Sequence, residues 1–151
     1  MTSAILQNQT LVSACSAWVV AQVMKTLIDC RMNGSFKKER LVGSGGMPSS
    51  HSSTVTALAT SAGMCYGVGS YQFTVAFILA MVVMYDARGV RLETEKQAKI
   101  LNHILEENPF DWSEDIVEER LKEFVGHTFF QVIVGALLGF FIAVVIGLVF
   151  Y

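Results

Sequence analysis

The sequence has few charged residues, few prolines and few cysteines for its length. Charged residues make up 16% of the 151 residues and hydrophobic residues 52%, whereas soluble domains carry about 25% charged residues. The net charge of -2 offers no basic surface, so nucleic acid is not an expected partner. The three cysteines form no CxxC pair and no metal-ligand cluster is apparent, so we expect no disulfide framework, no metal and no cofactor.

Long apolar stretches predict an all-α, polytopic membrane helical bundle. Residues 129–151 carry no charge, and about 20 apolar residues suffice to cross a hydrocarbon core. Further crossings are predicted at 11–28 and 71–85, and the small residues of 54–69 are typical of a helix buried among others. We therefore expect about four membrane helices in a single domain that covers residues 1–151.

Small residues recur every fourth position in the last apolar stretch, at Gly135, Gly139, Ala143 and Gly147. Residues four apart lie on one helix face, so they form a groove that lets another helix approach closely. Such small-faced helices also suit a homodimer.

The distribution of basic residues predicts the orientation in the membrane. No lysine or arginine lies in residues 1–24, in 51–85 or after 122. With four crossings, the charged loops share one side, and both termini share the other side with the short 67–70 turn. The positive-inside rule makes the charged side cytoplasmic in a bacterial cell membrane or its equivalent. Lys25, near the end of the first crossing, is expected to extend its ammonium toward the membrane surface.

Two amphipathic helices are predicted between the third and fourth crossings, at 93–107 and 114–125. The first has apolar residues at helical spacing and a Glu95–Lys99 pair that would support it. We interpret both as an interfacial cap on the membrane surface, because the stretch is too short for a core of its own.

A glycine- and serine-rich loop is the most informative stretch of the chain. Gly45 and Gly46 permit tight turns that aim backbone N–H groups inward, and Pro48 suits a first helical turn. Ser49 and Ser50 then lie at a helix N-terminus, which attracts anions through free N–H groups and the helix dipole. The pattern predicts a phosphate site; the alternative is a glycine-rich loop with a serine N-cap.

The loop is followed by a histidine and preceded by basic residues. His51, in the first helical turn, can donate a proton to a leaving group. Lys38 lies in the basic run that precedes the loop and is a candidate to bind phosphate oxygens. These neighbours favour the phosphate site over the plain capped loop.

Further polar residues flank the third and fourth crossings. Asp86, Arg88 and Arg91 follow a membrane helix directly, where charges are costly unless they are paired or functional. The two arginines suit phosphate binding, although an interfacial ion pair with Asp86 accounts for at least one of them. His127 precedes the last crossing, and Gln131, one turn later, can hydrogen-bond its imidazole. The alternative for His127 is an interfacial histidine without a special role.

Five motifs in a fixed order carry a family resemblance over about residue 10 to the C-terminus. They are GGMPSSHS at 45–52, YDARGVR at 85–91, KQA at 96–98 with LN at 101–102, GHT at 126–128 and GALLG at 135–139. The chain resembles the divergent type 2 phosphatidic acid phosphatase family, which is related to bacterial acid phosphatases and vanadium haloperoxidases.

This resemblance implies a membrane phosphatase that acts on a lipid phosphate or polyprenyl diphosphate. His127 would attack phosphorus and form a phosphohistidine, and His51 would be the acid. The broader superfamily places an aspartate where Gln131 stands, and a Ser-Arg pair where Arg120 and Leu121 stand.

These departures keep two alternatives open. The first is a non-catalytic protein that retains the pocket and binds a phosphorylated lipid or a partner. The second is a structural membrane protein that assembles through its glycine groove and has no ligand.

Overall fold

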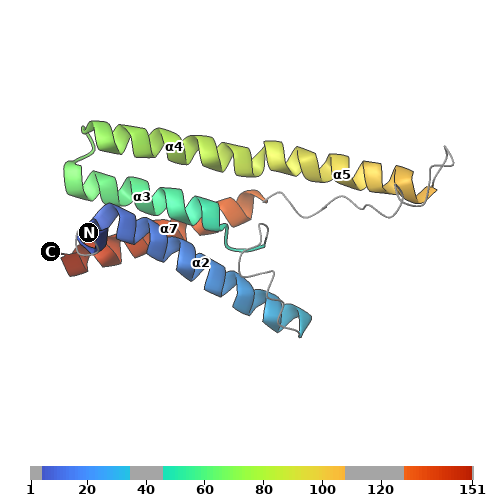
Figure 1. Cartoon of the computed structure of the whole chain (residues 1–151), viewed down its shortest axis with the longest axis horizontal. Helices are drawn as coiled ribbons and strands as arrows, with labels where there is room; N and C mark the ends of the chain where they lie inside the picture. Colours follow the sequence, from blue (N-terminus) through green and yellow to red (C-terminus); the bar gives the residue numbers. More distant parts are fainter. Residues whose placement is uncertain (1–4, 35–45, 108–127, 151) are drawn as a thin grey trace.

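The computed structural model describes residues 5–34, 46–107 and 128–150. The described residues are almost entirely helical and contain no strand, which confirms the predicted all-α membrane bundle. Figure 1 shows the helices in chain order: α2 (Gln9–Asn33), α3 (Ser50–Tyr66), α4 (Tyr71–Arg88), α5 (Val90–Glu107) and α7 (Phe129–Phe150).

Three of the described helical segments are long and apolar enough to cross a membrane. They are α2, the stretch Tyr71–Glu107 that begins with α4, and α7. The other predicted crossing corresponds to α3, which has 17 residues and therefore extends about 25 Å, against a hydrocarbon core of about 30 Å. The described part of the chain thus contains three candidate spans and one shorter helix beside them.

The shorter helix α3 lies at the centre of the bundle and packs against α2, α4 and α7. Alanines make these contacts close. Ala57 forms one buried cluster with Ala17 of α2 and Ala143 of α7, and Ala59 belongs to a second cluster with Ala76 of α4. The prediction of a small-residue helix buried among others is confirmed, because small side chains let the backbones of three neighbouring helices approach α3.

The glycine groove of α7 is filled by α3 of the same chain. Methyl groups added at Gly135 and Gly139 would overlap the carbonyl oxygens of Ser49 and Ser53. The predicted role of the groove in close packing is therefore confirmed within the chain. A homodimer remains a prediction, and it would have to use a different face, since this groove is occupied.

The termini, the α3–α4 turn and the starts of α3 and α7 lie at two different ends of the bundle. Figure 1 shows both termini at one end of the bundle, together with the turn that joins α3 to α4. At the other end, the start of α3 meets the start of α7 through a hydrogen bond from Ser49 N to Gln131 O of 3.2 Å. The predicted placement of loops and termini on the two sides of a membrane, with the charged side cytoplasmic, stays a prediction.

The amphipathic helix α5 follows α4 after Gly89. It covers the predicted 93–107 helix and contains the expected Lys99–Glu95 ion pair at 2.8 Å. Figure 1 shows α5 continuing in the direction of α4, away from the bundle, because Gly89 keeps helical backbone angles. The predicted second amphipathic helix, 114–125, lies outside the described residues.

Candidate functional site

The candidate site is built on the loop that enters α3. Gly46 has a φ of 82°, a left-handed conformation that glycine adopts readily. Pro48 follows a cis peptide bond and is fully buried. Ser49 then caps the helix: its hydroxyl accepts a hydrogen bond from Ser52 N at 3.3 Å. The local signals of glycine, proline and serine thus place the start of α3 where the sequence predicted it.

Buried hydroxyl groups surround this helix start. Ser49, Ser52 and Ser53 are completely inaccessible to solvent, and Ser50 is 3% exposed. Ser52 Oγ donates to Ser49 Oγ at 3.0 Å, and Ser53 Oγ donates to the carbonyl of Ala17 on α2 at 3.3 Å. The N-terminus of α3, which is the positive end of its dipole, is therefore surrounded by polar groups at one end of an apolar bundle. Such a setting favours an anion.

Lys25 of α2 brings a positive charge to this helix start. Its side chain is 2% exposed, and its ammonium donates to Ser50 Oγ at 3.3 Å. Its methylene carbons lie so close to Gly46 that a side chain at that position would crowd them. The expectation that Lys25 extends toward the membrane surface is therefore wrong. The lysine instead points into the bundle, as charged residues in membrane helices commonly do.

Gln22 lies one helical turn before Lys25 and is also buried, with 5% exposure. Its side-chain oxygen Oε1 has no hydrogen-bond partner. An unsatisfied buried polar atom costs free energy, so it calls for an explanation such as an absent ligand. A glutamine and a lysine one turn apart in an otherwise apolar segment were the signal that could have pointed to this face of α2.

His51 occupies the first turn of α3, directly after the capped serines. Its side chain is half-buried, and its Nδ1 atom is enclosed by the protein. The imidazole thus adjoins the hydroxyl and N–H groups of the helix start. The role of His51 as a proton donor beside a bound phosphate stays a prediction.

The start of α7 contributes Gln131 to the same region. Thr128 N donates to Gln131 Oε1 at 3.1 Å, and Gln131 N donates to Thr128 Oγ1 at 3.3 Å. This reciprocal pair is a capping box, which the spacing of Thr128 and Gln131 could have indicated. The predicted contact of Gln131 with His127 is not described, because His127 lies outside the described residues.

Arg88 lies at the end of α4 close to the start of α7. Its guanidinium carbon is 4.7 Å from the centre of the Phe129 ring, a cation–π contact. Arg88 is exposed and Asp86 is half-buried. The structure therefore brings Arg88 to the end of the bundle that holds Ser49, without showing a contact between them.

Three predicted phosphate-binding positions cannot be placed. Lys38 and Gly45 lie outside the described residues, as does the side chain of Arg91. Their roles stay predictions.

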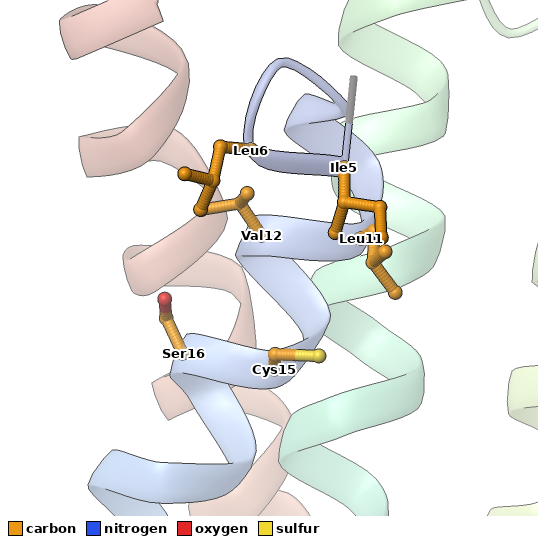
Figure 2. A pocket seen from close by; sticks show the side chains of 6 residues that line it. All are labelled: Ile5, Leu6, Leu11, Val12, Cys15 and Ser16. Atoms are coloured by element: carbon orange, nitrogen blue, oxygen red, sulfur yellow. The ribbon is translucent and has the colours of Figure 1, made fainter. Parts of the chain in front are cut away.

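Two hollows lie away from the candidate site. One, at the start of α2, is almost wholly apolar; Figure 2 shows its lining residues, Ile5, Leu6, Leu11, Val12, Cys15 and Ser16. The other lies where α4 meets α5, beside Tyr85 and Glu93. Among the described residues that line them, neither hollow has a basic side chain.

Comparison with known proteins places the chain among membrane proteins. A sequence profile described as the divergent PAP2 family matches residues 6–142. The chain is also similar to the uncharacterized membrane protein YuiD of Bacillus subtilis (strain 168), with 34% identity over 97% of this chain and 98% of YuiD. No solved structure matches the chain.

Proposed function

This chain belongs to the divergent PAP2 family, and from that premise we propose that it is a membrane phosphatase of a lipid phosphate or polyprenyl diphosphate. The observation that carries the proposal is the buried Lys25 ammonium, which contacts Ser50 Oγ at the N-terminus of α3. Burying an ammonium costs several kcal/mol unless it is compensated. A phosphate oxygen is a suitable partner for a buried ammonium, because hydrogen bonds between charged groups are short and strong.

The polar groups at this helix start match the needs of a phosphate group. Its oxygens would accept hydrogen bonds from N–H groups of the first turn of α3 and from the Lys25 ammonium. Gly46 suits this loop, because its left-handed backbone favours glycine and because a Cβ atom there would lie only 3.2 Å from Lys25 Cγ. Lys38 and the two arginines, Arg88 and Arg91, would supply further positive charge around the same group.

The depth of the site suits a lipid substrate. α3 runs from Ser50 to Tyr66, about 25 Å at 1.5 Å per residue. If α3 crosses a hydrocarbon core of about 30 Å, Ser50 lies close to one membrane boundary, which is where phosphate groups of lipids reside. A phosphorylated lipid would reach Lys25 without leaving the membrane.

The proposed reaction has two steps. An imidazole nitrogen of His127 attacks phosphorus, so that a P–N bond forms and the P–O bond to the lipid breaks, while His51 donates a proton to the departing oxygen. Water then attacks the phosphohistidine. The P–N bond breaks, His51 takes a proton from the water, and inorganic phosphate leaves.

A second function, binding without turnover, is favoured by the start of α7. The residue four positions after His127 is Gln131, whose amide oxygen caps α7 at Thr128. A neutral amide cannot stabilise an imidazolium as a carboxylate does. On this alternative, the pocket holds a phosphorylated lipid or a partner and performs no chemistry.

Phosphate release distinguishes the two functions. Protein purified in detergent is given phosphatidic acid or a polyprenyl diphosphate, and inorganic phosphate is measured. We expect His51→Ala and His127→Ala each to lower kcat by about a hundredfold or more, while His103→Ala, an exposed residue paired with Glu107, changes nothing. Turnover that is unaffected by both substitutions rules out this mechanism, and saturable binding without phosphate release establishes the alternative.

A further inference from the structure

One face of α3 is left uncovered by the other described helices. α2 and α7 pack on one side of α3 and α4 packs on another, but within residues 9–107 α2 and α4 make no contact with each other. The uncovered line consists of His51, Thr54 and Leu58, which are half-buried, and of Cys65, which is exposed. These positions are three, four and seven residues apart, so they follow one another along a single helix face.

The chemical character of this line changes along the helix. It begins with His51, beside the Lys25–Ser50 contact. The hydroxyl of Thr54 donates to Ser50 O at 2.7 Å, so it presents its methyl group without an unsatisfied donor. Leu58 packs against the apolar cluster shared by α3 and α4. The line therefore passes from a proton donor to an apolar surface, in the same order as a lipid passes from head group to tail.

We infer that the hydrocarbon chain of the lipid substrate lies along this face of α3 and enters between α2 and α4. This inference rests on the phosphate site proposed above. From His51 to Cys65 the face extends roughly 20 Å at 1.5 Å per residue, enough for most of an acyl or prenyl chain. The tail would stay in the hydrocarbon layer while its phosphate meets Lys25.

This path would favour long-chain substrates by aligning them, not by binding their tails tightly. A lipid tail gains little from moving out of surrounding lipid onto an apolar helix face, because both surroundings are apolar. The line instead aligns the lipid so that the phosphate arrives beside His51. A bulky side chain on the line should therefore hinder long-chain substrates and spare a phosphate ester without a long tail.

The test compares two substrates with the same head group, dioleoyl and dibutyryl phosphatidic acid. Leu58→Trp places an indole on the line, and Ile78→Trp places one on the exposed opposite side of α4 as a control. We expect Leu58→Trp to lower kcat/KM for the dioleoyl ester about tenfold, because a displaced tail misplaces the phosphate relative to His51. The dibutyryl value should stay unchanged, and Ile78→Trp should affect neither. Cys65→Trp, at an exposed position, serves as a second block with a smaller effect of the same kind if Leu58→Trp unfolds.

The outcomes separate this inference from the proposed function. Equal losses for both esters, or no loss for either, overturn the path along α3 and leave the phosphatase proposal standing. If neither ester is hydrolysed by the unaltered protein, the phosphatase proposal fails, and equilibrium binding of the same two esters decides the path. Weaker binding of the dioleoyl ester alone in Leu58→Trp supports it, and absence of binding of either ester overturns it.

Discussion

The contact between α2 and α3 has a pair of polar side chains near each of its two ends, and the two pairs differ in charge. Near the chain termini, Ser13 Oγ donates to Ser61 Oγ at 3.3 Å, and both side chains are fully buried. At the other end, Lys25 Nζ donates to Ser50 Oγ over the same distance. A neutral hydroxyl pair is sufficient to join the two helices. The buried ammonium is therefore more than the packing of the two helices requires, which supports the proposal that Lys25 binds a ligand.

The largest loss of stability is expected at the close contact of α3 with α7. Gly139→Leu would force a side chain into the backbone of α3 at Ser53, and we expect a loss of about 3 kcal/mol in the free energy of unfolding. Thermal unfolding in detergent, followed by circular dichroism, measures it. Val145→Leu, on the exposed side of α7, is the control and should change little. Equal stability of the two variants would contradict the close contact of α3 with α7.

Removal of the charge tests the functional end directly. Lys25→Met keeps the length of the side chain and removes its ammonium, so we expect phosphate-lipid affinity to fall roughly a hundredfold, the equivalent of a charged hydrogen bond. Isothermal titration with phosphatidic acid in micelles measures this. Lys96→Met removes an exposed lysine of α5 and should leave affinity unchanged. A Lys25→Met protein that binds as tightly as the original would remove the ammonium from the site.

Substitutions in the neutral Ser13–Ser61 pair should change stability and leave lipid affinity unchanged. Ser13→Ala removes one hydroxyl of a buried pair, so it should lower the free energy of unfolding by about 1 kcal/mol and leave lipid affinity unaltered. Adding Ser61→Ala should cost less than the first change, because the two residues share one hydrogen bond. Chemical denaturation of the single and double variants measures both effects. A change in lipid affinity would show that the two ends are not independent.

The smallest effect on lipid affinity is expected for the exposed Arg88. Arg88→Gln removes an exposed cation that lies over Phe129, so lipid affinity should weaken only about twofold if the arginine merely packs on the ring. Phe129→Leu in the Arg88→Gln background should then add nothing. A loss comparable to that of Lys25→Met would instead show that Arg88 binds the phosphate directly. The same titration measures all three variants.

Local patterns foretold much of this structure. The start of α3 follows from Pro48 and Ser49, and the groove of α7 follows from glycines four residues apart, because each signal lies within a few positions of the feature it produces. The number of candidate spans was harder to predict, because the small residues of α3 indicate an inner helix but do not show whether that helix crosses the membrane.

Lys25 was misjudged for a related reason. A lysine near the end of an apolar helix can extend to the membrane surface or turn inward, and local sequence does not distinguish the two. The crossing of α2 with α3 decides the outcome, and that crossing depends on Ala17 and Ala57, which are far apart in the chain. The spacing of Thr128 and Gln131 is sufficient to indicate the capping box. Gln131 was instead predicted from the sequence to hydrogen-bond the imidazole of His127.

The hydrogen bond from Ser49 N to Gln131 O has a consequence for biosynthesis. Ribosomes make the loop before α3 ahead of α7, so the loop has no acceptor at Gln131 until the start of α7 has been synthesised. A nascent chain that stops before α7 would contain Ser49 and the other serines at the start of α3 but would lack the carbonyl that holds Ser49 N. The proposed anion site would thus gain this anchor only when α7 is made.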